Sequence, residues 1–401
     1  MKKPLLSILF ILFFSISSIA QESENKLFRF KTNNLFGFIN QKGEIIVEPQ
    51  YTTVGLFSEG LCAVVKRENN ESKLGYIDYH GEVVIPLQYQ QYLYWGSDFS
   101  DGRAAVRLDD KSGYINTKGE IIFQASLYKA HPFHNGFAVI EKDYGIRSVI
   151  NKEGKIVFDP IEAYKRQRAN KPVGKELLYL NDKVNNGVIT FAVTFGSSYP
   201  STQKMGYFKM NGEMVFPLNY LTGNYQENLV QVYNADRTKA GYLDKKGNTA
   251  IPLKFKTVSD FYNGKALVKD INTNKYGIID NRGNYIIQPN YRHISKYFYK
   301  SDIIMVRNDS GKTGYINAKG EPISEFKYEY GLDFSEGFAF VYSRANGCEF
   351  IDKTGESAFD LDFDSPSNYL NASFSGGLAK IRMNKKNAYI NTKGEVVFTY
   401  E

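Results

Sequence analysis

The sequence is poor in the residues that mark catalytic and metal-binding proteins. It has one tryptophan, two cysteines and four histidines in 401 residues. Two cysteines, Cys62 and Cys348, are too few for a disulfide framework. Cys62 lies in an apolar run, so we expect a small buried residue there. No Gly-x-Ser-x-Gly, His-Glu-x-x-His or phosphate-loop motif occurs, so the common hydrolase, metalloprotease and nucleotide-binding signatures are missing.

A strong charge imbalance is missing too. The formal net charge is +7, and it falls to +5 once the two lysines near the N-terminus, Lys2 and Lys3, are left out. This mild excess has no RNP, zinc-finger or helix-turn-helix pattern beside it, and we therefore expect no nucleic-acid partner.

Long hydrophobic runs are confined to the first twenty residues. Lys2 and Lys3 precede an apolar stretch from Leu5 to Ile16, and small residues up to Ala20 follow. This order predicts a signal peptide over 1–20, cleaved after Ala20. The alternative is an uncleaved anchor, but the run is short for a spanning helix. We expect a mature chain of 21–401 without a membrane span, in the periplasm or secreted.

A short phrase recurs through the rest of the chain. Its first copy runs from Gly37 to Glu44 and reads Gly-Phe-Ile-Asn-Gln-Lys-Gly-Glu. The second glycine of the phrase returns every 35 to 39 residues, with one gap of 58, at positions 43, 81, 119, 154, 212, 247, 283, 320, 355 and 394. A fixed period of this size is typical of repeat architectures. The array leaves no room for a separate catalytic domain.

Each copy predicts three strands. Strand a is the phrase itself, such as Gly314-Tyr315-Ile316-Asn317, and a tight turn ending in glycine follows it. Strand b comes next, and we expect a proline such as Pro86 to end it or place it at an edge. A second phrase, such as Phe99-Ser100-Asp101-Gly102, then precedes strand c. We expect the tyrosine and isoleucine of strand a and the phenylalanine of the second phrase to form the core.

The predicted fold class is therefore all-β. We expect about ten three-stranded antiparallel meanders of roughly 36 residues, stacked as an open twisted solenoid or tube. A propeller-like ring is the alternative. Propellers usually share one blade between the two ends of the chain, and this array shows no split unit. Helical periodicity is nearly absent, with only Ile161 to Arg168 as a possible short turn. The mature chain, 21–401, is one array with an insertion at 160–200.

These phrases resemble the WG (or KWG) repeat family over about residues 26 to 401. The unit of that family reads roughly Trp-Gly-Tyr-Ile-Asp-x-x-Gly, then Ile-Pro-x-x-Tyr, then Phe-Ser-x-Gly-Leu-Ala-x-Val. The name-giving tryptophan is replaced, for example by Phe36 and Leu74, and three copies replace the first glycine by Ser148, Glu349 and Ala388. The resemblance implies a bacterial, often exported binding or scaffold array. It supplies no catalytic, cofactor, metal or ligand residues to carry over.

Two clusters could hold a metal ion. His131 and His134 lie three apart, but Pro132 between them forbids a helix interior, and we interpret them as exposed turn residues. Asp360, Asp362 and Asp364 alternate with apolar residues, which would place three carboxylates on one strand face. Calcium prefers such oxygen ligands. The simpler interpretation is the wet face of an edge strand.

The 58-residue gap contains one oversized connection at 160–200. It carries a cluster of basic residues, namely Lys165, Arg166, Arg168, Lys171 and Lys175. Insertions in repeat arrays often map to the binding face. A basic loop there suits a phosphate or an acidic glycan, and a degenerate repeat with solvated charges is the alternative. The strand c pattern that begins at residue 186 places the insertion within the array.

The sequence thus predicts a non-catalytic extracytoplasmic scaffold that binds a protein or an envelope glycan and needs no cofactor. The alternative is a carbohydrate-active or calcium-dependent enzyme that uses an irregular region at 160–200 or 360–375. Glutamates such as Glu44 and Glu82 recur after the turn glycine. Since a catalytic acid is needed once, their repetition favours a surface role.

Overall fold

The computed structural model describes residues 26–90, 97–109, 111–143, 146–159, 162–163, 177–185, 187–195, 202–211, 213, 221–234, 236–364 and 372–401. In these ranges the chain is almost wholly strand and turn, with helix only at 162–163. The predicted all-β class is confirmed. No helix in the described part is long and apolar enough to cross a bilayer. The predicted signal peptide and about half of the 160–200 insertion lie outside these residues.

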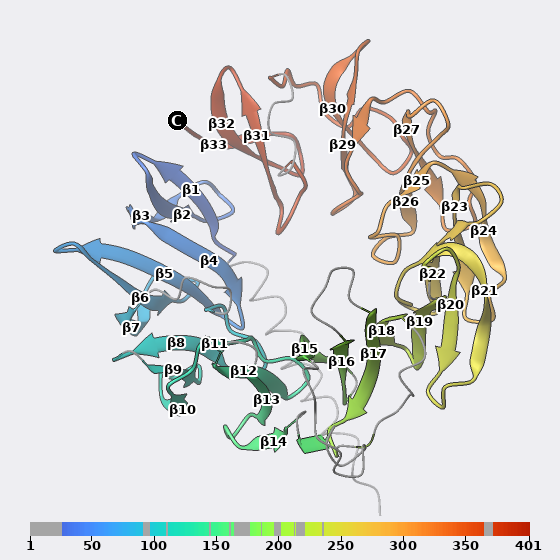
Figure 1. Cartoon of the computed structure of the whole chain (residues 1–401). Coiled ribbons are helices and arrows are strands. Elements are labelled where there is room, and N and C mark those ends of the chain that lie inside the picture. The colour runs from blue at the N-terminus through green and yellow to red at the C-terminus, as the bar shows by residue number, and fades with distance from the viewer. Residues whose placement is uncertain are drawn as a thin grey trace, which may run out of the picture. The chain divides into compact units, whose positions relative to one another are not determined.

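The described chain forms two compact units. The first holds 26–56, Gly60–Leu87 and Tyr328–Glu401, and the second holds Phe57–Glu59 and Gln88–Lys327. The strands of the first unit, two of which reach into the second, are β1 (Phe28–Thr32), β2 (Leu35–Ile39), β3 (Ile45–Tyr51), β4 (Thr53–Ser58), β5 (Leu61–Glu68), β6 (Glu71–Ile77), β7 (Val83–Gln90), β28 (Tyr330–Gly331), β29 (Ala339–Ser343), β30 (Gly347–Ile351), β31 (Leu378–Met383), β32 (Lys386–Asn391) and β33 (Val396–Tyr400) (Figure 1).

The second unit continues the same pattern. Its strands are β8 (Ala104–Leu108), β9 (Lys111–Ile115), β10 (Ile121–Ala125), β11 (Lys129–Ala130), β12 (Phe137–Asp143), β13 (Ile146–Asn151), β14 (Ile156–Phe158), β15 (Leu177–Asn185), β16 (Val188–Phe195), β17 (Thr202–Lys209), β18 (Leu221–Gln226), β19 (Leu229–Tyr233), β20 (Ala240–Asp244), β21 (Thr249–Val258), β22 (Lys265–Asp270), β23 (Tyr276–Asp280), β24 (Tyr285–Tyr291), β25 (His293–Ile294), β26 (Ile303–Arg307) and β27 (Thr313–Asn317).

The predicted antiparallel meander is present. Strands c and a pair as expected, for example β1 with β2 and β22 with β23, and strand b follows as β3 and β24. The predicted strand c of the insertion is also confirmed, since β16 pairs with β17 along its whole length. In two copies strand b shrinks to an isolated bridge, Ile316↔Pro322 and Ile351↔Ser357. Those copies are not complete three-stranded meanders.

A short extra strand precedes strand c in most copies, which corrects the three-stranded unit. The strands β4, β11, β15, β18, β25 and β28 each pair with the strand c that follows. In two repeats the extra strand is the end of a longer strand whose first part is strand b of the previous repeat: β21 pairs with β22, and β7 pairs with β8 at Gln90. Several of these strands are only two residues long, too short for an alternating pattern to reveal them.

The tight turn between strands a and b forms as predicted. The Gly43 amide donates to the Asn40 carbonyl at 3.1 Å, and Gly43 has a φ of +82°. The Asn40 side chain accepts from the backbone amides of Lys42 and Glu44 at 2.9 and 3.0 Å. An Asn or Asp that opens the turn and a glycine that ends it therefore satisfy separate needs, side-chain acceptance and positive φ.

The prolines of strand b do not end it. The other predicted outcome, an edge position, is confirmed for β3 and β24, which lie at the end of their sheets, but not for β7 and β21. Pro49 lies inside β3, where three residues of strand b face one residue of strand a, Gly37. The resulting bulge crowds that glycine, and a Cβ there would lie 2.5 Å from the Val47 carbonyl oxygen. Proline is tolerated because a bulge needs no ladder donor. In the last repeat, Ala388 replaces this glycine and faces Thr399 without an inserted residue.

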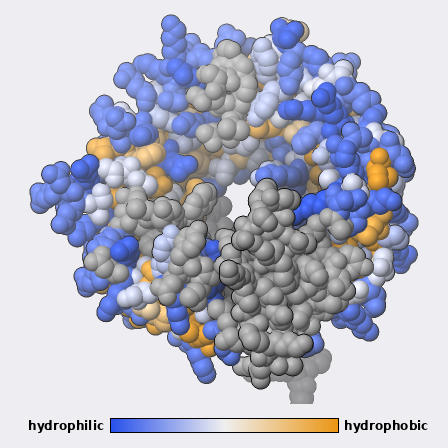
Figure 2. All heavy atoms as spheres, viewed as in Figure 1, coloured by the Kyte–Doolittle hydropathy of each residue, from blue (hydrophilic) through white to orange (hydrophobic). Residues whose placement is uncertain are grey.

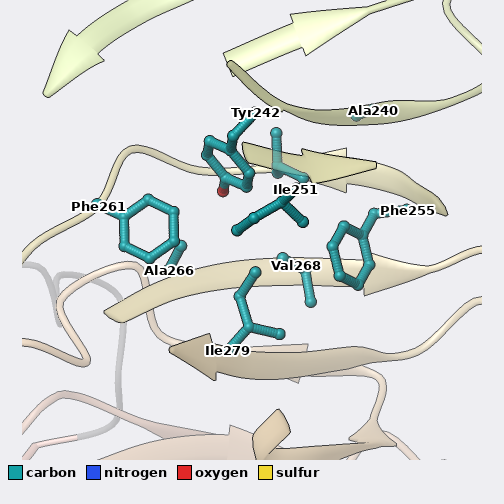
Figure 3. Close-up of a cluster of buried hydrophobic side chains, with 9 residues drawn as sticks. Ala240, Tyr242, Ile251, Phe255, Phe261, Ala266, Val268 and Ile279 are labelled. Atoms are coloured by element: carbon teal, nitrogen blue, oxygen red, sulfur yellow. The ribbon is translucent and has the colours of Figure 1, made fainter. Parts of the chain in front are cut away.

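Neighbouring repeats share their cores, as the aromatic pattern predicts. In Figure 3, Tyr242 and Ile251 of one repeat point toward Phe261 and Val268 of the next. All four are at most 1% exposed. The Tyr242 and Phe261 rings meet edge to face at 4.8 Å, and the Tyr242 hydroxyl donates to the Ser259 carbonyl at 2.7 Å. A repeat buries its apolar face only against its neighbour.

Within the first unit, the first repeat of the array packs on the last (Figure 1). The Phe30 ring lies 5.0 Å from the Phe398 ring, and the Tyr389 hydroxyl donates to the Arg29 carbonyl at 2.7 Å. Sheets β1-β2-β3 and β31-β32-β33 remain separate. The contact is made by side-chain packing and not by a shared sheet.

Candidate interaction surface

The second phrase links several neighbouring repeats. Its serine hydroxyl donates to the carbonyl of the phenylalanine that begins the following copy, at 2.6 Å in each case. The pairs are Ser58 with Phe99, Ser100 with Phe133, and Ser335 with Phe374. A small hydroxyl residue is needed at this position because it reaches a backbone acceptor in the adjacent turn. The phrase is therefore structural at these three copies.

The acidic residue of the same turn makes a second link. Carboxylates here accept from backbone amides of the next glycine turn: Glu59 from Gly102 at 2.8 Å, Asp101 from Gly136 at 2.7 Å, Glu227 from Asn263 and Gly264 at 2.6 and 2.9 Å, and Glu336 from Gly377 at 2.8 Å. Charge-assisted bonds of this kind are stronger than neutral ones. These acids hold the array together.

The last copy of the second phrase lacks this acidic residue. Gly376 stands where the acid would be, and the ammonium of Lys26 donates to the Ser375 hydroxyl at 2.8 Å. Gln41 donates to the Gly376 carbonyl at 2.7 Å. A Cβ on Gly376 would lie 2.2 Å from the Lys26 side chain. The last turn is thus shaped to receive the first repeat.

The recurring glutamates after the turn glycine are surface residues. Glu44, Glu120, Glu321 and Glu395 are exposed, and each accepts from the asparagine of its own turn at 2.6–2.7 Å. Glu213 pairs with Lys209 at 2.9 Å, and the hydrogen bond from Lys209 lowers the pKa of that carboxyl. These carboxylates serve the turn.

Large apolar side chains are exposed at the first two positions of strand b in several repeats. They follow the residue after the turn glycine, which is glutamate except for Lys155 before Ile156, and they are 40–48% exposed: Ile45, Ile46, Val83, Val84 and Val396 in the first unit, and Ile121 and Ile156 in the second. Strands β3, β10, β14 and β33 each lie at the end of their sheet. We call these seven residues the strand b row. Elsewhere, the face in Figure 2 is mostly hydrophilic with separate apolar patches.

The two predicted metal candidates take other roles. His131 is buried, contrary to the expectation of an exposed turn, because its segment pairs with β12 and its carbonyl accepts from the Tyr114 hydroxyl at 2.7 Å. Asp364 accepts from the Lys385 amide at 2.6 Å and lies 3.8 Å from Arg382. Asp360 and Asp362 are exposed, on a segment that is not a strand. Among the described residues, no group of three or more His, Cys, Asp or Glu could hold a metal ion.

The remaining candidates have mixed outcomes. Cys62 is fully buried, as predicted, and Cys348 is buried too, and the two do not form a disulfide. The basic residues at 165–175 lie outside the described residues. Residues 365–371 of the second irregular region also lie outside them.

The fold and this surface define an all-β repeat protein. A sequence profile described as "WG containing repeat" matches residues 36–70, 75–111, 113–144, 241–272, 276–311 and 314–343, about half of the chain. The chain belongs to the WG repeat family, which confirms the resemblance. A comparison with curated proteins finds no match.

Solved structures resemble the chain only distantly. Kluyveromyces lactis Hsv2 is 13% identical over 64% of this chain and 90% of that one, with a TM-score of 0.32. The extracellular domain of a putative hybrid two-component system, BT3049 from B. thetaiotaomicron, is 11% identical over 94% and 65%, with a TM-score of 0.23. Pyrococcus horikoshii acylaminoacyl peptidase is 10% identical over 73% and 57%, with a TM-score of 0.32. Scores this low carry no argument about this chain.

Proposed function

We propose that the protein is a non-catalytic, extracytoplasmic scaffold whose strand b row docks a protein partner. The observation that carries the proposal is the recurrence of exposed Ile and Val at the first two positions of strand b in several repeats. An enzyme needs one distinctive pocket, whereas an interaction array repeats its surface. The expected signal peptide supports a location outside the cytoplasm.

Physical chemistry favours a partner on this row. In β3, β10, β14 and β33, strand b presents its apolar side chains at a sheet edge, where unpaired backbone groups and exposed apolar surface invite another chain. Strand β7, which carries Val83 and Val84, lies inside its sheet and offers exposed apolar surface only. An extended segment of a partner would add to such an edge through main-chain hydrogen bonds, with the β-branched side chains giving specificity. Glu44 and Lys42 flank the row with both charges, which suits a mixed polar rim.

The proposal includes a closed cycle of repeats, the propeller-like alternative, in place of the open solenoid. Its support lies in the first unit. Turn glycines pack on the preceding repeat: a Cβ on Gly81 would meet Val47 of strand b at 2.4 Å, and one on Gly394 would meet Phe359, just after the strand b bridge, at 2.8 Å. Gly43 has no preceding repeat in the sequence, yet a Cβ there would lie 2.1 Å from the Val397 carbonyl oxygen. The last repeat occupies the preceding place.

A capture experiment tests the docking surface. Purified 21–401 is used as bait against an envelope fraction, with and without protease treatment. The test variant is I45T/V83T/V396T, which makes three exposed positions of the row polar. The matched control is L56T/I271T, which changes two exposed apolar residues outside the row.

The proposal predicts a protein captured by the wild type and the control, and at least about a tenfold weaker capture by the row variant. Thermal unfolding checks that both variants remain folded. Equal capture by the row variant, or capture that survives protease treatment, would contradict a protein partner on this surface.

A further inference from the structure

Two neighbouring repeats lack the serine that elsewhere donates to the phenylalanine carbonyl of the following copy. The serine position of the second phrase holds Tyr262 in one copy and Tyr299 in the next. These rings stack on each other, with centroids 4.2 Å apart and planes at 18°. A tyrosine is too long to make the short hydrogen bond that serine donates to the adjacent carbonyl. The structural role of this position therefore does not explain why two copies have tyrosine.

The turn between β25 and β26, which also carries Tyr299, presents a third ring next to buried residues. Ser295 and Phe298 are 3% and 4% exposed, whereas Tyr297 between them is 41% exposed. The Ser295 hydroxyl accepts from the Tyr297 amide at 3.1 Å, and the Lys300 amide donates to the Tyr297 carbonyl at 2.8 Å. These bonds fix the turn between β25 and β26 before any ligand arrives (Figure 1).

Two cations flank this exposed ring. The ammonium groups of Lys296 and Lys300 lie 4.9 and 4.8 Å from the Tyr297 ring centroid. Asp302 is the nearby exposed acid on this segment, and Asp260 lies beside Tyr262. Burial, with the Asp260 charge, raises the pKa of Tyr262, so its hydroxyl stays protonated and can donate.

We infer that Tyr262, Tyr297, Tyr299, Lys296 and Lys300 form a binding site for an acidic polysaccharide. The faces of aromatic rings are electron-rich and attract the polarised C–H groups of a sugar ring, and the two ammonium groups pair with its carboxylates. The site is separate from the strand b row. It rests on the proposed function only for the extracytoplasmic location, where envelope glycans are found. Single-stranded nucleic acid uses similar chemistry and is an outcome of the test.

The test is direct binding of purified 21–401 to polygalacturonate, measured by calorimetry and by mobility in a gel that contains the polymer. Neutral dextran is the matched probe. The key variant is Y262S/Y299S, which restores the serine that the repeat uses elsewhere and therefore preserves the fold. K296Q/K300Q removes the two charges, and K42Q/K118Q removes two exposed lysines elsewhere. Tyr128→Ala is the control for an exposed tyrosine.

We expect binding to polygalacturonate but not dextran, weakened at least about tenfold by Y262S/Y299S, by Tyr297→Ala and by K296Q/K300Q. The two control variants should change the Kd by less than about twofold. No binding by the wild type, or equal loss in K42Q/K118Q, would overturn the site. Tighter binding of oligo-dT through the same residues would overturn the glycan assignment. Failure here leaves the capture experiment unaffected, because that experiment tests other residues.

Discussion

The turn glycines illustrate how much a single residue decides in this array. Gly81 has a φ of +79° and lies against the preceding repeat, while Gly60 has a φ of +84° with open space around it. Both positions penalise any Cβ through the backbone, but only Gly81 also lacks room. Backbone strain and close approach can therefore be separated by experiment.

Gly60→Ala should lower the free energy of unfolding by about 1 kcal/mol, from the positive φ alone. Gly81→Ala should cost about 1–3 kcal/mol more, because the new Cβ meets Val47 of the preceding repeat. Denaturant unfolding of the two variants measures the difference. Equal losses would show that the inter-repeat contact at Gly81 does not limit the side chain.

A second residue-scale prediction concerns Tyr389, at the contact between the last and first repeats. Burial raises the pKa of Tyr389 to about 12, against about 10 in an unfolded chain. Between pH 10 and 12 the folded state keeps a proton that the unfolded state loses, so stability falls as pH rises. This contribution is fully present below pH 10.

Tyr389→Phe removes that titration together with the hydrogen bond to Arg29. The wild type should be more stable than Y389F below pH 10 by about 1 kcal/mol. From pH 10 to 12 the difference should fall by on the order of 2 kcal/mol. Unfolding free energies of both proteins across this range measure it. A difference that stays constant with pH would mean that the pKa of Tyr389 is the same in the folded and the unfolded chain.

At the scale of the elements, the inter-repeat bonds of the acidic turn residues make a separate prediction. Glu227→Ala removes the acceptor of two backbone amides in the next repeat, at Asn263 and Gly264. We expect a loss of about 1 kcal/mol, since the bonds are charge-assisted but exposed. Glu321→Ala, whose carboxylate binds only within its own turn, should cost less than about 0.5 kcal/mol. Thermal or denaturant unfolding compares the two variants, and equal losses of stability would argue against a stabilising role of the acidic hydrogen bonds between repeats.

Several elements could be predicted from the sequence because their cause is local. Asn40 and Gly43 specify the turn by side-chain acceptance and positive φ, and both properties belong to the residue type. The core tyrosines and phenylalanines follow from the repeating pattern in the same way. Tyr114 and Phe133, for example, are 1% exposed as predicted.

Other elements depend on contacts that no short pattern records. The extra strand β11 is two residues long and forms through backbone bonds, such as the His131 amide to the Val139 carbonyl at 3.0 Å. The burial of His131 follows from that pairing and not from its neighbours in sequence. The edge position of the Pro49 strand was among the predicted outcomes, but its bulge was not, because proline alone does not distinguish a bulge from a strand end or an edge. The pairing of Tyr262 with Tyr299 could have been noticed as two departures at one repeat position.

For the molecule as a whole, the contact between the first and last repeats is the feature with the widest consequences. Phe30 is 4% exposed and packs on Phe398 and Tyr400 of the last repeat, with ring centroids 5.0 and 5.9 Å away. In the interior of the array, the residue equivalent to Phe30, for example Val268, packs against residues of the adjacent repeat. An open array would leave Phe398 and Tyr400 without this cover.

Native-state hydrogen exchange of the full chain with Phe30→Ala tests the closed cycle most directly. Truncating Phe30 should speed amide exchange in β33 (Val396–Tyr400), more than 360 residues away, at least about tenfold beyond the change in β22 and β23. Phe261→Ala, at an interior core of the second unit, is the matched control and should speed exchange in β22 and not in β33. Exchange in β33 that is unchanged by Phe30→Ala would contradict the closed cycle.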